Sequence, residues 1–130
     1  MKKKVVFQPK VRYRLHPGYI AWILHRVTGV LLGLYLFLHI WVIHHIAKGE
    51  ESFNSVMAVV NSPFFHLLEI GLVGTVVYHA VNGLRVFFMD YGNLARRDLF
   101  RKATYVTFAV SLVLMAIGAI PMVKAVLFGH

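Results

Sequence analysis

The stretch that decides the fold class is residues 103–126, ATYVTFAVSLVLMAIGAIPMVKAV, which holds no charged side chain before Lys124. A helix needs about 20 apolar residues to cross roughly 30 Å of hydrocarbon, so this segment is long enough to span a bilayer. Two further segments, residues 19–46 and 64–89, are also long and apolar. The sequence therefore predicts an all-α membrane protein with three transmembrane helices, in a single transmembrane domain covering residues 1–130.

The composition supports a membrane protein and excludes several kinds of cofactor site. Hydrophobic residues make up 58% of the chain and charged residues only 15%, whereas soluble domains carry about 25% charged residues. The chain has no cysteine, which excludes disulfides, thiolate zinc sites, iron–sulfur ligation and covalent haem attachment by this chain. Histidine, methionine and carboxylate remain as ligands, and eight histidines is a high number for so apolar a chain.

The net charge of +9 follows the pattern of membrane topology. Basic residues gather before the first apolar segment and between the second and the third: Lys2, Lys3, Lys4, Lys10, Arg12 and Arg14, then Arg96, Arg97, Arg101 and Lys102. Cytoplasmic loops carry such an excess of lysine and arginine. We therefore expect residues 1–18 to form a cytoplasmic arm and the C-terminus to lie outside a bacterial-type cytoplasmic (inner) membrane. Because topology explains the charge, the charge does not indicate nucleic-acid binding.

The connections between the segments carry their own local signals. Residues 53–60 are apolar enough for a short surface helix in the external loop. Pro63 suits the first turn of the second span, because proline lacks the backbone N–H that a helix start leaves unpaired anyway. Residues 90–102 are expected to form the cytoplasmic loop between the second and third spans.

The chemistry is expected between the first two spans, because ionisable side chains inside a membrane are costly and usually functional. The first two spans hold His25, Arg26, His39, Glu69, His79 and Arg85, besides three histidines near the outer surface, His44, His45 and His66. The third span has none at depth. We therefore expect the third span to face mostly lipid or neighbouring helices.

His79 lies near the middle of the second span and shares a helix face with Gly71, Thr75 and Gly83. Small residues beside a histidine leave room for a large, flat group such as haem. The same pattern is typical of close helix packing, and a proton-relay histidine is a third interpretation. His39, toward the outer side of the first span, is likewise either a metal ligand or a partner in an interhelical hydrogen bond.

A second group of polar side chains is expected at the cytoplasmic side of the membrane, where His25, Arg26 and Arg85 gather. Such a group suits an anionic ligand, for instance a haem propionate, or a quinone carbonyl. The alternative is that the arginines extend to lipid phosphates. Asp90 would then be a local counter-ion or a proton carrier.

Two sequence motifs contain most of these residues, one in the second span and one in the first. Residues 79–92, HAVNGLRVFFMDYG, have a histidine followed by Gly-Leu-Arg and then by Asp-x-Gly. Residues 25–29, HRVTG, stand at the start of the first span. Together they resemble the signatures of the cytochrome b (b556) membrane anchor subunit of the succinate dehydrogenase/fumarate reductase family. The likeness includes the order of the three spans and extends over most of the chain after residue 18.

The resemblance implies roles for individual residues. His79 matches an axial ligand of haem b, and His25 and Arg26 match positions near the haem propionates and the quinone pocket. Asp90 matches the family's acid after the second span, whose role is less defined. Single-haem members often have a serine where this chain has Trp22, so a direct hydroxyl contact to quinone is lost. The quinone-site candidates are thus Trp22, His25, Arg26 and Asp90.

His39 makes the chain resemble the two-haem members of the family, which carry a histidine ten positions after the glycine of the first-span motif, as Gly29 and His39 do. A second hydrophobic anchor subunit would supply the other axial ligands and complete a larger helical bundle. An iron–sulfur subunit and a flavoprotein subunit would complete the enzyme, complex II. This chain would pass electrons to quinone and catalyse nothing alone.

Three alternatives stay open at this point. His39 and His79 could clamp one haem within the chain. A haem b subunit of another respiratory oxidoreductase also uses intramembrane histidines, although the residues after His79 do not follow its pattern. A cofactor-free transport or assembly protein would use the same histidines for protons or for packing.

Overall fold

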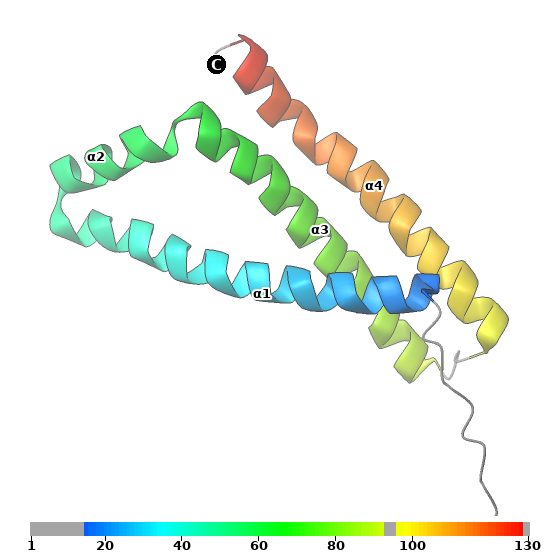
Figure 1. Ribbon diagram of the computed structural model, residues 1–130. Coiled ribbons are helices and arrows are strands. Elements are labelled where there is room, and N and C mark those ends of the chain that lie inside the picture. Colours follow the sequence, from blue (N-terminus) through cyan, green and yellow to red (C-terminus); the bar gives the residue numbers. More distant parts are fainter. Residues whose placement is uncertain (1–14, 93–95, 129–130) are drawn as a thin grey trace, which may run out of the picture.

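The computed structural model describes residues 15–92 and 96–128, and within these it contains helices and no strand. The elements are α1 (Pro17–His44), the short 3₁₀ helix η1 (His45–Lys48), α2 (Glu50–Val60), α3 (Pro63–Tyr91) and α4 (Arg97–Phe128) (Figure 1). Three helical segments, α1 with η1, α3 and α4, are long and apolar enough to cross a membrane. The structure therefore confirms the all-α membrane fold with three transmembrane helices.

Two of the long helices begin at a proline, as expected for Pro63. Pro17 opens α1, and His16 caps this helix because its Nδ1 accepts a hydrogen bond of 3.2 Å from the backbone N–H of Tyr19. Pro63 opens α3 directly after the extended residue Ser62. In both places proline presets a helical backbone angle and lacks a donor that would otherwise need a partner.

A tight connection links α1 to α2. The chain continues from α1 into η1 and then turns at Gly49, whose φ of +104° is strained for residues that have a side chain. The short helix α2 then crosses from the end of α1 to the start of α3 (Figure 1). It confirms the surface helix that residues 53–60 predict.

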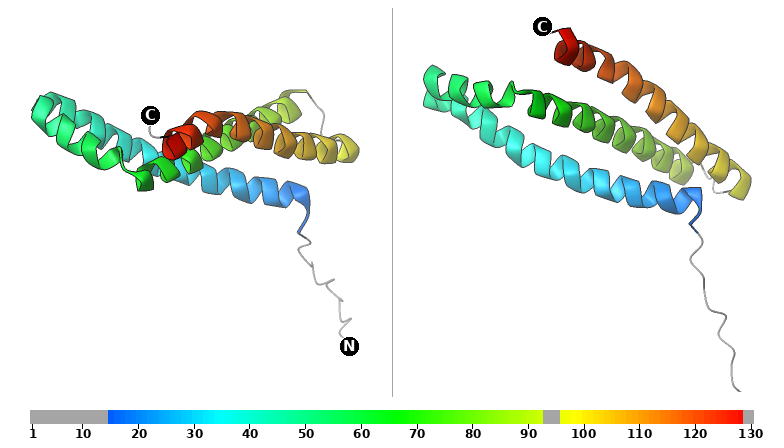
Figure 2. Two further views of the ribbon diagram at one scale, coloured as in Figure 1. Left: turned by 90° about the horizontal axis from the view of Figure 1, so that it is seen from above. Right: turned by 45° about the horizontal axis from the view of Figure 1, so that its top comes forward.

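The helices α3 and α4 lie side by side along most of their lengths (Figures 1 and 2). Two glycines allow this close approach. A Cβ atom at Gly74 would lie 2.7 Å from Cε of Met115, and one at Gly118 would lie 2.9 Å from Cγ1 of Val73. Small residues bring helix backbones together in membranes, where dispersion contacts rather than hydrophobicity drive association.

The helix α1 crosses α3 instead of following it. The crossing lies near the start of α1 and in the second half of α3, and the two helices separate toward α2 (Figure 1). At the crossing, the Tyr78 hydroxyl donates a hydrogen bond of 2.9 Å to the carbonyl of Ala21, which is fully buried. This end of the molecule therefore positions the side chains that α1 and α3 share.

The third helix starts earlier than expected. The sequence predicts a cytoplasmic loop up to residue 102, but α4 begins at Arg97 and includes Arg101 and Lys102 in its first two turns. Arginine and lysine are good helix formers, and Asp98 in the first turn is stabilised by the helix dipole. Hydropathy marks where the apolar part of a helix begins, and the helix itself extends beyond it.

The other boundaries agree more closely with expectation. The first span, predicted over residues 19–46, is α1 up to His44 followed by η1, and the second, predicted over residues 64–89, is α3. Of the expected arm, residues 1–14 lie outside the described residues, and its last two residues already belong to α1.

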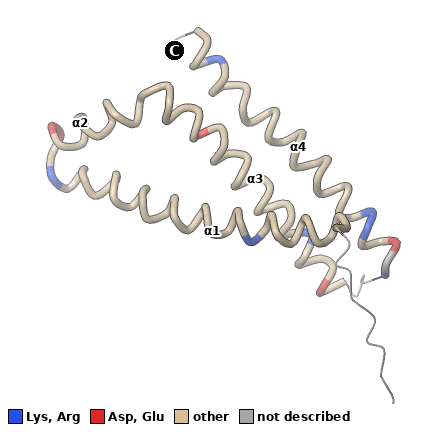
Figure 3. The backbone as a smooth tube through the Cα atoms, viewed as in Figure 1, with Lys and Arg blue, Asp and Glu red and all other residues tan. Residues whose placement is uncertain are grey.

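The outer surface of the described chain is apolar. Large hydrophobic side chains are exposed along all three long helices, and among the described residues only Ala21, Tyr78 and Met89 have a buried hydrophobic side chain. Most charged residues lie near helix ends, which leaves long uncharged stretches between them (Figure 3). Such a surface suits lipid and neighbouring helices rather than water.

Candidate functional site

Two intramembrane histidines meet where α1 crosses α3. The rings of His25 and His79 are stacked, with centroids 4.0 Å apart and planes 9° from parallel. Both side chains are half-buried. The sequence proposes each of these residues for the site, and the structure brings them into direct contact.

Glycines make this contact possible. A Cβ atom at Gly29 would lie 3.0 Å from Cε1 of His79, and a Cβ atom at Gly83 would lie 3.7 Å from Cε1 of His25. Each histidine ring therefore lies against a glycine of the opposite helix. From the sequence, Gly83 is expected to leave room beside His79. In the structure this glycine instead lies against the ring of His25.

The ring of His79 is also held by hydrogen bonds from α1. Its Nδ1 lies 3.1 Å from the Thr28 hydroxyl oxygen and 3.2 Å from the backbone carbonyl of His25. Nδ1 of His25 is buried and has no hydrogen-bond partner among the described residues. The site thus combines one well-anchored imidazole with one buried ring nitrogen that has no partner among the described residues.

The two arginines that the sequence predicts on the cytoplasmic side, Arg26 and Arg85, do not lie together in the structure. Arg85 extends toward α4, where its Nη1 donates a hydrogen bond to the Thr104 hydroxyl and its guanidinium lies 5.2 Å from the ring centroid of Phe100. Its Nε is buried and has no partner among the described residues. Arg26 is exposed and lies over the Trp22 ring at 4.4 Å. Within the described part of the chain, Arg26 and Arg85 therefore do not share a pocket.

The remaining quinone candidates, Trp22 and Asp90, are exposed. Trp22 is half exposed and also stacks on Tyr19, with ring centroids 6.1 Å apart. Asp90 is exposed near the end of α3. Trp22 and Arg26 thus form one exposed surface of α1.

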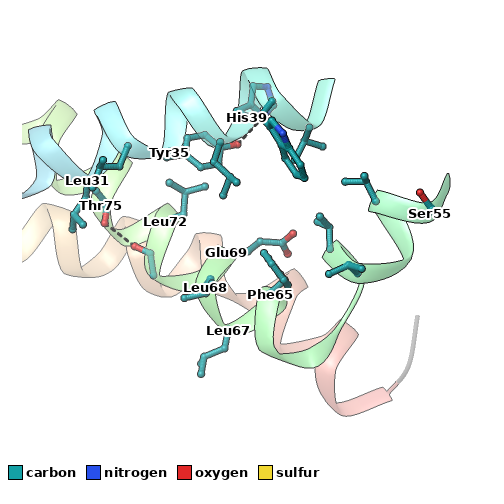
Figure 4. Close-up of a pocket in the computed structure, with 18 residues that line it drawn as sticks. Leu31, Tyr35, His39, Ser55, Phe65, Leu67, Leu68, Glu69, Leu72 and Thr75 are labelled. Carbon is teal, nitrogen blue, oxygen red and sulfur yellow. Dashed lines mark hydrogen bonds between the residues drawn. The ribbon is translucent and has the colours of Figure 1, made fainter. Parts of the chain in front are cut away.

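His39 lies at a cavity of about 880 Å³ between the diverging parts of α1 and α3, with α2 across its end (Figure 4). The Tyr35 hydroxyl lies 3.2 Å from Nδ1 of His39, which is exposed. The walls are mostly apolar, and Glu69 and Thr75 are among the polar side chains that line them. Glu69 also pairs with His66, whose Nδ1 is 3.1 Å from Oε2.

The structure does not bring His39 and His79 together. Thr28 contacts His79, and His39 is eleven residues further along α1, which corresponds to roughly 16 Å of helix. No group of three or more His, Asp or Glu side chains able to hold a metal ion occurs within the described part of the chain.

Sequence reasoning missed two polar residues at the centre of the molecule. Thr28 is part of the first-span motif, and its position three residues after His25, on the same helix face, is a signal that it could contact the same neighbour. Asn82 is 1% exposed, and both polar atoms of its amide lack a partner among the described residues. Nothing in the local sequence distinguishes Asn82 from a polar residue that faces a neighbouring chain.

Fold and site together define a helical integral membrane protein that holds a stacked histidine pair within its spans. Residues 2–118 match the family model described as succinate dehydrogenase/fumarate reductase transmembrane subunit. The chain therefore belongs to the family of succinate dehydrogenase and fumarate reductase transmembrane subunits, which confirms the predicted resemblance.

Individual relatives carry the same description. The chain is 35% identical over 83 residues to the succinate dehydrogenase 2 membrane subunit SdhC of Mycobacterium tuberculosis, which covers 64% of this chain and 61% of the relative. It is 40% identical over 76 residues to the succinate dehydrogenase hydrophobic membrane anchor subunit of Halobacterium salinarum, covering 58% of each. The succinate dehydrogenase cytochrome b558 subunit of Bacillus subtilis is 34% identical over 86 residues, 64% of this chain and 43% of that protein. The chain thus spans about three fifths of the length of the first two relatives.

Proposed function

We propose that this chain is the haem b-binding membrane anchor subunit of a succinate:quinone oxidoreductase, complex II. In this role it passes electrons from an iron–sulfur subunit to a membrane quinone and catalyses nothing alone. The observation that carries the proposal is the stacked pair of His25 and His79 inside the spans of a chain from this family. The name of the Bacillus subtilis relative, a cytochrome b558 subunit, supports haem b as the cofactor.

The residues at the crossing fit a haem. A haem ligand must be a neutral imidazole with one ring nitrogen free, and its other nitrogen is usually held by a carbonyl or another polar group. Nδ1 of His79 is held in this way from α1. When bound, the haem would accept and return single electrons. His79 would hold it, and His25 and Arg26 would lie toward its propionates, with Arg85 adding positive charge from the α4 side.

A second haem is proposed at His39. The cavity beside His39 is large and mostly apolar, as the surroundings of a haem in a membrane are, and the residue stands well apart from His79. Each haem of this class needs two axial ligands. This chain would supply one for each, so a second hydrophobic anchor subunit would supply the others and complete the helical bundle.

Quinone is proposed to bind at the cytoplasmic side, where Trp22, His25, Arg26 and Asp90 are the candidates. Trp22 offers an exposed aromatic face that already stacks with Arg26. Arg85 is not among these candidates, because it packs against Thr104 and Phe100 of α4.

The orientation that suits this function places the N-terminus in the cytoplasm and the C-terminus outside, in a bacterial-type cytoplasmic membrane. The positive-inside rule supports it, since basic residues precede α1 and also surround the start of α4. The iron–sulfur and flavoprotein subunits would then bind on the side where α1 begins, close to the stacked histidines.

The test is to purify the complex in mild detergent and to measure haem b per copy of this chain by the pyridine haemochrome. We expect two haems in the wild type and one each in His39→Ala and His79→Ala, since each variant removes one axial ligand. His66→Ala is the matched control, because His66 is also near the outer side but pairs with Glu69.

Two other results would change the proposal in different ways. One haem per copy that persists in His39→Ala would leave His39 with a packing role and make the chain a single-haem anchor. An intact complex without haem would contradict the cytochrome function and favour a cofactor-free membrane protein.

A further inference from the structure

We propose that Thr28 is a positioning residue that holds His79 as the tautomer protonated at Nδ1, and so leaves Nε2 as the nitrogen that binds iron. The inference rests on haem binding by His79, as proposed above. It assigns a role to a residue that touches neither haem nor quinone in the proposed function.

The direction of the hydrogen bonds follows from counting protons. The Thr28 hydroxyl has one proton, and its oxygen lies 2.7 Å from the Leu24 carbonyl and 3.0 Å from the His25 carbonyl. Carbonyls only accept, so the hydroxyl proton is used within α1 and its oxygen is left as an acceptor. Nδ1 of His79 faces this oxygen at 3.1 Å and the His25 carbonyl at 3.2 Å. Two acceptors require a donor, so Nδ1 carries the proton.

The surroundings of Thr28 keep this arrangement in place. The residue is 8% exposed, so water does not compete for its hydroxyl. The His79 ring is also confined by the stacked ring of His25 and lies close to Gly29. Rotation of the ring to present Nδ1 to a metal would break both hydrogen bonds inside a membrane, where replacement partners are scarce.

A chemical consequence follows for the bound haem. An imidazole whose N–H donates to a fixed acceptor is a more basic ligand, which stabilises ferric iron more than ferrous iron. Loss of the Thr28 oxygen would leave the His25 carbonyl as the remaining acceptor. The ligand would then be less basic and less firmly oriented, and the haem would become easier to reduce.

The experiment compares Thr28→Val, which keeps the shape and removes the hydroxyl, with Thr28→Ser, which keeps the hydroxyl, in the assembled complex. We expect Thr28→Val to lower the affinity of the His79 haem about tenfold, the lower limit for loss of such a partner. If the affinity falls for ferric haem and stays the same for ferrous haem, the midpoint potential rises by about 59 mV, the one-electron equivalent of a tenfold change. Thr28→Ser should restore the wild-type potential.

Thr107→Val is the matched control. Thr107 is another buried threonine, on α4, and among the described residues its hydroxyl makes no hydrogen bond with His79. A general effect of removing a buried hydroxyl would shift the potential in this variant as well. We expect it to leave both potential and haem content unchanged.

Each other outcome has a clear meaning. A wild-type potential in Thr28→Val, or equal shifts in Thr28→Val and Thr28→Ser, would overturn the role of the hydroxyl while haem binding stands. Absence of haem from the wild-type complex would instead overturn the proposed function. Should Thr28→Val not assemble, the pair Thr28→Ser and Thr28→Ala decides, because these two variants differ only in the hydroxyl oxygen. The proposal requires a higher potential in Thr28→Ala, and equal potentials in the two would overturn it.

Discussion

The two ends of the α1–α3 pair differ in how completely this chain builds them. Where the helices cross, the rings of His25 and His79 stack at 4.0 Å and Tyr78 donates to the backbone of α1. Where they diverge, His39 is exposed beside a cavity of about 880 Å³ and is held by Tyr35 of its own helix. His79 is oriented by the opposite helix, whereas among the described residues His39 has a hydrogen-bond partner only within α1.

The difference indicates which part of the proposed haem machinery depends on a partner. The contacts that orient His79 come from α1, so they form whenever α1 and α3 pack. No residue of α3 is bonded to His39 within the described chain, so the geometry there depends on whatever fills the cavity. We therefore expect the His79 end to tolerate loss of the partner subunit better than the His39 end.

The largest effect is expected from a pair of glycine-to-alanine variants, one at the crossing and one toward the diverging end of α1. Gly29→Ala places a Cβ 3.0 Å from Cε1 of His79, whereas Gly33→Ala, one turn further on, meets nothing within 4 Å. Overpacking costs about 1–3 kcal/mol, while alanine in an open helix position gains up to about 1 kcal/mol. Gly29→Ala should therefore be the less stable variant by at least ~1 kcal/mol.

The measurement is the free energy of unfolding in mixed micelles titrated with a denaturing detergent. Gly71→Ala on α3, which also meets nothing within 4 Å, is a second control from the open end. Equal stability of the three variants would mean that the crossing is as loose as the diverging end.

An intermediate effect is expected at the hydrogen bond that fastens the crossing. Tyr78→Phe removes the 2.9 Å bond to the Ala21 carbonyl and leaves the ring in place. A bond of this kind contributes about 0.5–1.5 kcal/mol, and about 0.6 kcal/mol on average between membrane helices. Tyr105→Phe, at an exposed position on α4, is the matched control. A loss no larger than that of the control would show that the crossing holds without this bond.

The smallest effect is expected at Asn82. The Asn82 amide is buried without a partner among the described residues. Asn82→Leu therefore replaces it with an apolar side chain of similar shape and breaks no hydrogen bond of the described chain. We expect the free energy of unfolding to change by less than about 0.5 kcal/mol or to increase. Thr104→Val is the contrast, since it deprives the half-buried Arg85 of its acceptor and should destabilise. A marked loss in Asn82→Leu would reveal a partner of Asn82 in the assembled complex.

Much of the fold could be predicted from hydropathy and from local signals. Long apolar segments predicted all three spans, Pro63 marked the start of α3, and residues 53–60 marked α2. The start of α4 was missed, because Arg97, Arg101 and Lys102 are polar yet helical. Apolar content indicates which part of a helix lies in lipid. Residues of high helix propensity extend the helix beyond that part.

The candidate site was predicted in part. Ionisable residues within apolar spans are costly whatever their neighbours, so His25, His39 and His79 could be found from the sequence alone. Which of them contact one another could not. Arg26 and Arg85 looked like one group by depth in the membrane, but their side chains leave in different directions around their helices.

By itself the sequence determined that this protein crosses the membrane three times, because the transfer of apolar side chains into lipid depends on composition and length. It also determined the family, through motifs that are local in the chain. Only the tertiary structure decided that His79 stacks on His25 beside Thr28, while His39 is left at an open cavity. The way in which α1 and α3 cross decides which side chains become neighbours. The crossing depends on short-range packing at positions such as Gly29 and Gly83, and hydropathy contains no information about such packing.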